Sequence, residues 1–523
     1  MKRTILAITS LLCGTLLMAQ TEFDAQKLLN PDITGTARYM GMAGAFGALG
    51  GDASAIKDNP GGLAIYRTSE LTGTLNLLYQ NSNSTWNGTG SSDNLLNTGF
   101  TNFSYVIATP TFRSQSGNSG LLSSNWSISY NKLKSFDRNS TTKTVNSGSS
   151  ITDYMGYFTG NISSSDLSNA NSGTYNPYDN VNIPWISVAG YNGWLINETV
   201  TSGTSSWSSV LSAGELVTPS FSIQERGSID EYSIGWAGNF SNELFIGLTG
   251  NLQSVNYSMS SQYMEYFANG GGMTLSNSLS TTGVGVNMNL GAIYRPMDML
   301  RLGFAVHSPT VFGLSDSNSA NLDYFLSATN NGNFDTPVAS NTYLLSTPWK
   351  INASAAIILG QKGLVSAEYD RNFNTSSYFM DHKYSTNNFT EENKGIKSIL
   401  KDVQTLKFGA EYKYTTNLAL RVGFANISAG TSPTADLLLQ PYTTRTDVQY
   451  FLNNNTNLYT VGIGYREAGW YIDLAYVNKS VNETFFAYNT NKLTELNPSL
   501  VAVIPANINT ISNNVVVTFG LKF

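Results

Sequence analysis

The two histidines are the first candidates for chemistry, because an imidazole can ligate a metal or move a proton near neutral pH. His307 and His382 stand far apart in the sequence, and the one cysteine, Cys13, lies near its start. Zinc sites are usually built from histidines and cysteines at short spacings. We therefore expect each histidine to be a hydrogen-bonding group of a strand or loop, and we predict no metal and no cofactor.

A run of glycines could also indicate chemistry. Gly41, Gly44, Gly47 and Gly50 recur in a stretch that is rich in alanine. A phosphate-binding loop has the spacing G-x-G-x-x-G and follows a strand, and this run has neither feature. The chain also lacks the G-x-S-x-G turn that presents a serine nucleophile. We therefore predict that the protein is not an enzyme.

The composition favours a membrane protein that is built from strands. Charged residues make up 12% of the 523 residues, and aromatic residues also reach 12%. The charged share is about half that of an ordinary soluble domain. The mature chain contains no run of the roughly 20 apolar residues that a membrane-spanning helix needs. A membrane protein of this composition is therefore expected to be a β-barrel.

The segment MKRTILAITSLLCGTLLMAQ at the start of the chain has the layout of a secretory signal peptide. Lys2 and Arg3 precede an apolar run that ends near the small residue Ala19. We predict that residues 1–19 are removed on export, together with Cys13. The net charge then falls from -6 to -8, with 27 basic against 35 acidic residues. Such a chain is not expected to bind nucleic acid.

Beyond Tyr66, apolar and polar residues alternate over segments of about ten residues, as in strands with one apolar face. In the last segment, Val515, Val517 and Phe519 lie on one face, and Thr518 lies on the other. We predict fourteen strands, near residues 68–80, 99–112, 122–134, 227–240, 243–257, 278–295, 298–310, 347–359, 362–374, 401–414, 416–427, 456–466, 469–482 and 511–523.

The connections distinguish a membrane barrel from a soluble sandwich. Short turns such as Ser241-Asn242 alternate with long loops rich in serine, asparagine, threonine and glycine. The longest loop covers about residues 135–225 and is expected to fold back over the barrel mouth. Short turns at one end and long loops at the other are typical of bacterial outer-membrane barrels. The terminal aromatic, Phe523, resembles the signal that such barrels present to the barrel assembly machinery.

Several segments together resemble the FadL, OmpP1 and TodX family of outer-membrane transporters for hydrophobic compounds, in a Bacteroidetes-like form. They are the glycine- and alanine-rich segment that ends in Asn59-Pro60-Gly61, LGAIYRPMDMLRLGFAVHSPT (290–310), PWKINASAAI with GLVSAEYD (348–370), LKFGAEYKYTTNLALRVGFA (406–425) and VGIGYREAGWYIDLAYV (461–477). Hairpins of different barrels converge in composition, so the resemblance rests on the order and spacing of these segments.

The resemblance implies an all-β fold, a 14-stranded antiparallel transmembrane β-barrel over residues 67–523, with residues 20–66 folded inside the lumen as a hatch. It places candidate ligand-binding or gating residues in the hatch, namely Phe46, Asn59, Pro60 and Gly61. The family motif is Asn-Pro-Ala, and Gly61 departs from it. Glycine gives more backbone freedom to that turn.

Charged residues on the predicted inner faces are expected mainly to brace the barrel by ion pairs. Arg301, Lys407 and Arg421 are the candidates among them for binding a ligand carboxylate.

The resemblance also implies the function of a monomeric channel in the outer membrane. Long-chain fatty acids or other hydrophobic compounds would be taken up passively through a hatch-gated lumen. They would leave sideways into the lipid through a gap beside a kinked strand, for which Pro110 in the second strand is a candidate. A second hypothesis is a FadL-like barrel that acts as a scaffold or shuttle for protein partners, as in type IX secretion. The predicted plug disfavours a plain porin.

Overall fold

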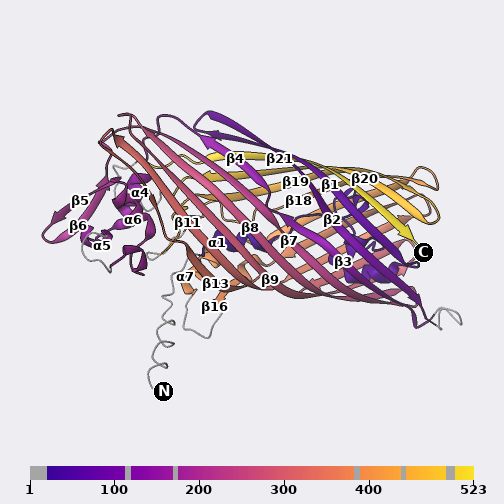
Figure 1. Cartoon of the computed structure of the whole chain (residues 1–523). Coiled ribbons are helices and arrows are strands. Elements are labelled where there is room, and N and C mark those ends of the chain that lie inside the picture. Colours follow the sequence, from indigo (N-terminus) through magenta and orange to yellow (C-terminus); the bar gives the residue numbers. More distant parts are fainter. Residues whose placement is uncertain (1–19, 112–118, 169–174, 382–388, 438–442, 490–500) are drawn as a thin grey trace, which may run out of the picture.

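The structure is a computed structural model that describes residues 20–111, 119–168, 175–381, 389–437, 443–489 and 501–523 (Figure 1). The predicted signal peptide, residues 1–19, and His382 lie outside these ranges. Within them, the segments of alternating apolar and polar residues form long strands that wind around a common axis. Short helices lie inside the ring of strands and at one end of it (Figure 1).

The strands form one closed antiparallel barrel of fourteen, as predicted. The strand segments of the barrel are β1 (Glu70–Trp86), β2 (Thr89–Pro110), β3 (Leu121–Ser135), β4 (Arg138–Lys143), β7 (Val217–Phe240), β8 (Leu244–Phe267), β9 (Gly272–Met297), β10 (Leu300–His307), β11 (Val311–Ser327), β13 (Ala339–Ser346), β14 (Lys350–Leu359), β15 (Gly363–Asn372), β16 (Tyr378–Asp381), β17 (Val403–Lys413), β18 (Leu418–Ile427), β19 (Tyr450–Arg466), β20 (Trp470–Phe486) and β21 (Ala506–Lys522).

Four barrel strands are each interrupted once. Segments β3 and β4, β10 and β11, β13 and β14, and β15 and β16 therefore follow one another along single strands. The first and last strands pair from Glu70 opposite Lys522 to Thr85 opposite Asn507, and this seam closes the sheet. A closed sheet has no free edge, so every strand of the wall has a neighbour on both sides.

The outer face of the barrel carries an apolar belt. On β8, Leu244, Ile246 and Leu252 are exposed, and the next side chains on the same face, Ser254 and Asn256, are polar. β9 shows the same change from apolar to polar outward residues. An apolar band about 25 Å tall around a closed sheet is the lipid-facing surface of a membrane-spanning barrel.

The wall is much taller on one side than on the other (Figure 1). Strands β7 and β8 have 24 residues each and β9 has 26, whereas β17 has 11 and β18 has 10. The long loops predicted over residues 81–98 and 258–277 are wrong, because these residues are mostly strand, joined by short turns. Strand pairing continues above the belt, where the outward residues of β8 and β9 are mostly polar, so the apolar outer face that marks the strands in the belt is missing.

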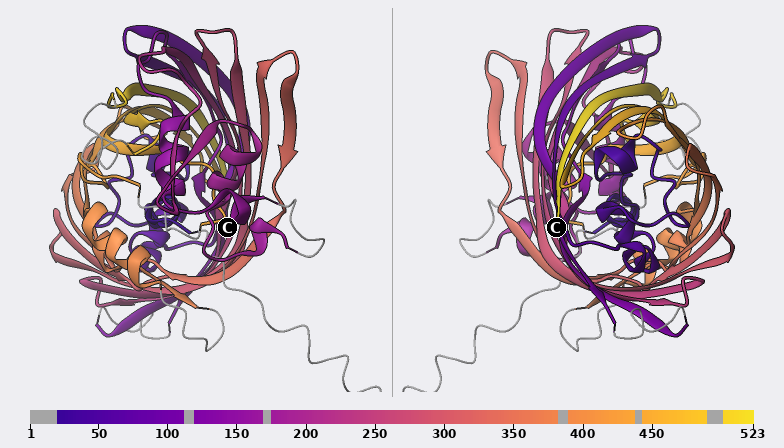
Figure 2. Two further views of the ribbon diagram at one scale, coloured as in Figure 1. Left: turned by 90° about the vertical axis from the view of Figure 1, so that its left-hand side faces the viewer. Right: turned by 90° about the vertical axis from the view of Figure 1, so that its right-hand side faces the viewer.

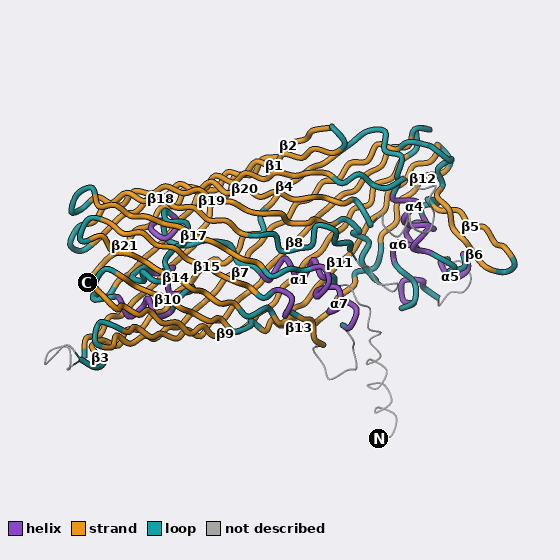
Figure 3. Tube along the Cα trace, turned by 180° about the vertical axis from the view of Figure 1, so that it is seen from behind, coloured by secondary structure: helices purple, strands orange, loops and turns teal. Residues whose placement is uncertain are grey.

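The predicted loop over residues 135–225 contains β4, the start of β7 and a folded unit of residues 151–209, which we call the cap (Figures 1 and 3). The Ile151 N–H at the start of the cap donates to Glu265 of β8 (2.8 Å), and Gly193 lies against Leu322 of β11. The cap therefore packs on the tall wall. Its elements are α4 (Ile151–Thr159), α5 (Ser164–Leu167), η3 (Pro177–Asp179), α6 (Trp185–Asn192), β5 (Ile196–Thr201) and β6 (Thr204–Ser209).

Residues 20–66, which we call the N-terminal segment, lie inside the ring of strands (Figure 2). Thr21 and Asp24 form a reciprocal capping box that starts α1, and Asn59 caps η2. Among the described helices, none is both long and apolar enough to cross a membrane. The segment contains α1 (Glu22–Leu29), α2 (Ala37–Met40), η1 (Ala53–Lys57) and η2 (Pro60–Ile65); the remaining elements of the chain are β12 (Asn330–Asp335), η4 (Asn374–Ser376) and α7 (Thr390–Ile399).

Candidate functional site

Buried hydrogen bonds attach the inner part of the N-terminal segment, residues 36–66, to several strands of the wall. The bonds run from Ala37 N–H to Thr518 Oγ1 (2.7 Å), from Gly47 N–H to Glu368 Oε2 (2.6 Å), from Asn125 Nδ2 to Leu63 O (2.9 Å) and from Arg301 Nη1 to Leu49 O (2.8 Å). These partners belong to β21, β15, β3 and β10. This part of the segment is therefore held from several directions at once.

The four predicted hatch residues are all buried in this part of the segment. Phe46 is fully buried, with its ring centroid 5.7 Å from that of Tyr39. Asn59 Nδ2 donates to Gly47 O (2.7 Å) and to Ala292 O of β9 (3.0 Å), and Asn59 Oδ1 accepts from Gly61 N–H (3.0 Å). Pro60 is the first residue of η2. Asn59 thus joins two parts of the segment to the wall.

The glycine at position 61 is explained by the backbone that faces it. A Cβ there would lie 2.9 Å from Phe245 O and 3.0 Å from the Cα of Ala292. The wall strands have matching glycines. A Cβ on Gly247 would lie 2.2 Å from Pro60 O, and one on Gly291 would lie 2.1 Å from Asn59 Oδ1. In the sequence, glycines in the interiors of the adjacent strands β8 and β9 are the signal for this close approach.

The three predicted carboxylate-binding cations lie in the wall around the N-terminal segment. Lys407 Nζ contacts Glu368 Oε1 (2.7 Å) and Asp370 Oδ2 (2.8 Å). Arg421 is fully buried and pairs with Glu411 (2.7 Å) and Asp473 (2.6 Å). Arg301 donates to a carbonyl of the N-terminal segment. The structure thus gives Lys407 and Arg421 carboxylate partners from the protein itself, and binding of a ligand carboxylate by the three residues stays a prediction.

A cavity of about 310 Å³, which we call the outer cavity, lies between α1 and the wall. Its apolar lining includes Phe23 of α1 and Phe221, Ile223, Met259 and Phe451 of the strands. Sequence analysis did not single out these residues, since they look like any other inward positions of a barrel. Its charged lining consists of the cations Lys27, Lys134, Arg138, Arg445 and Lys479 and the carboxylates Asp24, Asp32, Asp137, Glu225, Asp447 and Glu483.

A second cavity of about 130 Å³, the inner cavity, has a mixed lining, in which Lys57, Asp58, His307 and Lys350 stand beside apolar residues such as Leu28 and Phe312. The ring Nε2 of His307 lies 2.9 Å from Asp58 O, in line with the predicted hydrogen-bonding role. Within the described ranges, no three His, Cys, Asp or Glu side chains are arranged to hold a metal ion.

Residues 30–32 line both cavities and separate them. This partition is held by Lys479 Nζ, which contacts Asp32 Oδ1 (2.5 Å), and by Lys134 Nζ, which donates to Asn30 O (3.2 Å). Asn372 Nδ2 also donates to Asn30 Oδ1 (2.9 Å). The two cavities are therefore neighbouring compartments, and each has both apolar and charged residues in its lining.

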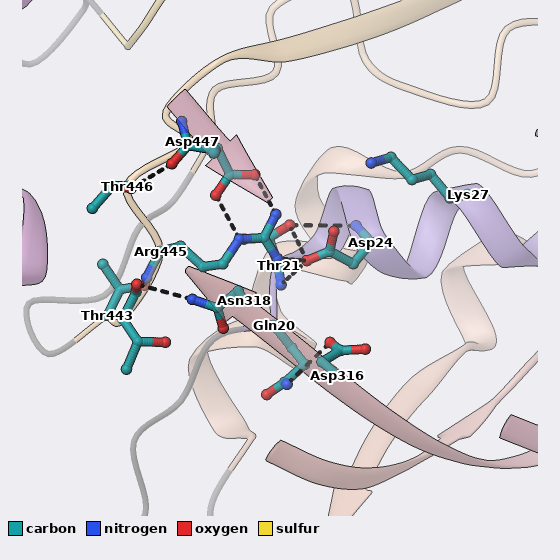
Figure 4. Close-up of polar contacts among 12 residues, drawn as sticks. Gln20, Thr21, Asp24, Lys27, Asp316, Asn318, Thr443, Arg445, Thr446 and Asp447 are labelled. Atoms are coloured by element: carbon teal, nitrogen blue, oxygen red, sulfur yellow. Dashed lines mark hydrogen bonds and ion pairs between the residues drawn. The ribbon is translucent and has the colours of Figure 1, made fainter. Parts of the chain in front are cut away.

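The outer cavity is bounded by a loop, residues 443–447, that connects four parts of the molecule (Figure 4). Arg445 Nη1 contacts Asp24 Oδ2 of α1 (3.1 Å), and Asn318 Nδ2 of β11 donates to Thr444 O (3.2 Å). Thr446 Oγ1 donates to Asn277 of β9 (2.5 Å). The Trp185 N–H at the start of α6 donates to the carbonyl of residue 443 (3.2 Å). The loop thus ties α1 to the cap and to the tall wall.

Electrostatics strengthen this contact between α1 and the loop. Burial would raise the pKa of the Asp24 carboxyl, but the guanidinium of Arg445 and the ammonium of Lys27 outweigh it, and the pKa is lowered. At Asp52, in contrast, burial prevails over the attraction of Arg38, and the pKa is raised. Asp24 is therefore held as a carboxylate by its neighbours. Sequence analysis missed Asp24 and Arg445, and the only local signal was the charged pair Arg445 and Asp447 in a polar loop.

The barrel wall is incomplete beside the outer cavity. The ladder between β2 and β3 covers residues 102–110 and 123–131, and beyond it the described residues of β2 are paired with β1 alone. β3 ends at Ser135, and β4 starts at Arg138. Opposite this interruption, Gly227 of β7 has φ +114°, and a Cβ there would lie 2.0 Å from Asn256 O. The third strand is therefore interrupted here, whereas Pro110, the candidate from the sequence, lies at the far end of the ladder between β2 and β3, opposite Ser123.

We call this place, between residues 97–101 of β2 and 132–137 of the third strand, the wall break. One hydrogen bond crosses it, from Asn97 Nδ2 to Asp137 Oδ2 (2.5 Å). On the outer face, the rings of Phe100 and Tyr130 stack with centroids 5.8 Å apart. Residues 135–138 line both the wall break and the outer cavity. Side chains thus fill an opening that backbone hydrogen bonds do not close.

Comparison with known proteins agrees with this architecture. No family model matches the chain, and no curated protein sequence matches it. A FadL homologue of Pseudomonas aeruginosa superposes with a TM-score of 0.54 at 12% identity, over 95% of this chain and 100% of that one. The toluene transporter TodX of Pseudomonas putida superposes with a TM-score of 0.49 at 12% identity, over 95% and 100% of the two chains. The likeness to the first of these establishes a shared fold.

Proposed function

We propose that this chain, which has the fold of a FadL homologue, is an outer-membrane channel for the passive uptake of hydrophobic compounds. One observation carries the proposal, namely that the partly apolar outer cavity lies directly against the wall break. A ligand in this cavity is separated from the surrounding lipid by side chains alone. We further propose that residues 1–19 are a cleaved signal peptide and that residues 20–66 act as the hatch.

The position of the wall break supports a lateral exit. Phe100 within the wall break, and Leu96 of β2 and Ile128 of β3 on either side of it, are exposed on the outer face. A ligand that leaves between β2 and the third strand therefore reaches the outer edge of the lipid-facing surface. Transfer of an alkyl chain from water to an apolar medium is favourable by about 0.8 kcal/mol per methylene group. Partitioning of the ligand into the lipid would thus drive its exit, with no other energy source.

The axial route is less suited to such a ligand. Below the partition, the inner cavity is the smaller of the two and has the charged groups Lys57, Asp58 and Lys350 in its lining, and buried residues 36–66 lie inside the ring of strands. Arg38 of α2 pairs with Glu411 of β17 (3.0 Å), so moving this part of the segment would also break a buried ion pair. Breaking such a pair costs about 3–5 kcal/mol. Passage through the wall avoids this cost.

A reversible cross-link across the wall break tests the proposal. Asn97→Cys and Asp137→Cys, joined by a short reducible bis-thiol reagent, should reduce the uptake of radiolabelled dodecane by expressing cells to the level of cells without the protein. Reduction of the cross-link should restore uptake. The predicted mature chain has no other cysteine, so the reagent has no competing target.

The matched control is the pair Asn81→Cys and Asn94→Cys, whose native side chains also share a hydrogen bond (2.7 Å) but join β1 to β2 on the outer face. This cross-link should leave uptake unchanged. Full uptake with the wall break cross-linked would contradict the lateral exit. If no uptake depends on the protein at all, and protein partners co-purify with it without lipid, the scaffold hypothesis would replace the channel.

A further inference from the structure

We propose that the outer cavity selects neutral hydrophobic ligands and rejects carboxylates. This inference rests on the proposed function, because it names the class of compound that the channel takes. It runs against the expectation of fatty acids from the family resemblance. The reasons are the pairing of the charges in the cavity and the nature of the remaining surface.

Protein groups already occupy the cations that line the outer cavity. Four of the five described cations contact a carboxylate, and the fifth, Lys134, donates to two backbone carbonyls (2.7 and 3.2 Å). A ligand carboxylate therefore has to compete with a protein group for each of these cations. The ion pairs are Arg445 with Asp24 (3.1 Å) and Asp447, Lys479 with Asp32 (2.5 Å), Arg138 with Glu483 (3.1 Å) and Glu225 (3.8 Å), and Lys27 with Glu225 (3.6 Å).

The charge of the cavity makes such a displacement unfavourable. Its described lining has five cations and six carboxylates, so it carries one negative charge more than it carries positive charges. A ligand carboxylate would add a further negative charge among these groups. Burying an ion without a partner is costly, even where the protein can relax around it. An uncharged headgroup avoids this cost.

Arg138 lies against the aromatic lining and is held on two sides. Its guanidinium lies over the ring of Phe451 (4.2 Å to the centroid), and its Nη1 donates to Glu483 (3.1 Å). The rings of Phe221 and Phe485 stack behind it, with centroids 4.8 Å apart. The guanidinium is thus held between a ring and a carboxylate, and turning it toward a ligand would break both contacts. A ligand in the cavity would therefore contact mainly the apolar and aromatic residues of its lining.

The test compares two ligands of equal chain length, decan-1-ol and decanoate, at about pH 8, where a carboxylic acid is ionised. The full mature protein in lipid nanodiscs is dialysed against each ligand, and binding to empty nanodiscs is subtracted. The native protein should bind decan-1-ol at least about tenfold more tightly than decanoate, a difference of about 1.4 kcal/mol.

The variant Glu483→Gln tests the inference more directly, because it removes the nearest carboxylate of Arg138 and keeps the cation. Its affinity for decanoate should rise by about tenfold, while its affinity for decan-1-ol should change by less than about twofold. The control is Glu391→Gln, which makes the same exchange in an exposed pair with Lys394 (2.6 Å) on α7. It should change neither affinity. If Glu483→Gln does not fold, Asp32→Asn frees Lys479 and serves the same purpose.

The outcomes separate this inference from the proposed function. If native protein binds decanoate as tightly as decan-1-ol, or if neither Glu483→Gln nor Asp32→Asn gains decanoate affinity, the selection of neutral ligands is overturned while the channel stands. If native protein binds neither ligand, the outer cavity is not a ligand site, and the proposed function fails with it.

Discussion

At the residue scale, the contact between η2 and the wall depends on the absence of three side chains. Gly61, Gly247 and Gly291 meet where the turn Asn59-Pro60-Gly61 touches β8 and β9. The atoms that a Cβ would strike are mostly backbone, which cannot rotate away as the end of a long side chain can. A single methyl group is therefore enough to separate the N-terminal segment from the wall at this point.

Gly61→Ala should therefore destabilise the folded protein by about 1–3 kcal/mol, the usual cost of forcing an extra carbon into a packed interior. The measurement is the midpoint of urea unfolding in liposomes, followed by the loss of the compact band on unheated gels. Gly73→Ala on β1 is the control, because a Cβ there has nothing within 4 Å. Equal midpoints for the two variants would show that the wall can yield at residue 61.

The charges show how far single residues could be predicted. The period of the strands placed Lys407 and Arg421 on the inner face, and both are buried there. Their partners could not be predicted in the same way, because Glu368 lies opposite Lys407 and Glu411 lies opposite Arg421 only in the register that the structure has. One strand alone does not specify the register of its neighbour. Cations that looked free in the sequence are therefore paired in the fold.

At the scale of elements, the loop of residues 443–447 makes the attachment of α1 depend on pH. Burial opposes ionisation of Asp24, but Arg445 and Lys27 lower its pKa below the ordinary value of 3.8. A lowered folded-state pKa means that the stabilisation is complete above about pH 3.8 and is lost as the pH falls through the lower folded value. Hydrogen exchange in α1, corrected for the intrinsic rate, should accelerate in that acid range and stay constant above it.

The variant Asp24→Asn separates this effect from general acid unfolding. It should exchange faster than native protein at neutral pH, and its corrected rate should not accelerate further in the acid range. Exchange in α2, which has its own attachments to the wall, serves as the internal reference. If α1 and α2 respond to acid together, the contact between Asp24 and Arg445 does not control the attachment of α1.

The elements also differ in how well the sequence predicts them. All fourteen strands were found because lipid requires an apolar residue at every second position, and this is a strong local signal. Above the belt, the outward residues of β8 and β9 are serine, threonine, asparagine and glutamine, and the inward face is mixed, so the same strands resembled loops. The cap was also read as a loop, since its helices have nine residues or fewer and are too short to show a helical period in the sequence. The wall break depends on strand pairing, which composition does not encode.

At the scale of the whole molecule, the N-terminal segment should set the conductance. Deleting residues 21–60 removes most of the material that fills the lumen, so single-channel conductance in planar bilayers should rise well above that of the native protein. Deleting residues 196–209 of the cap is the control, because β5 and β6 form a separate two-stranded sheet. That deletion should leave conductance unchanged. A deletion of residues 21–60 that folds but conducts like native protein would refute the plug.

The seam between β1 and β21 has a consequence for the lifetime of the barrel. It joins the two ends of the chain, and the hydrogen bond from Ala37 N–H to Thr518 Oγ1 spans 481 residues. Contacts between such distant residues form late, because a long loop must first be closed. The N-terminal segment also touches early, middle and late strands, so these contacts form and break together with the seam. The lifetime of the folded barrel in the membrane is then set by the rate at which the seam and these contacts break together. The protein is therefore kinetically as well as thermodynamically stable.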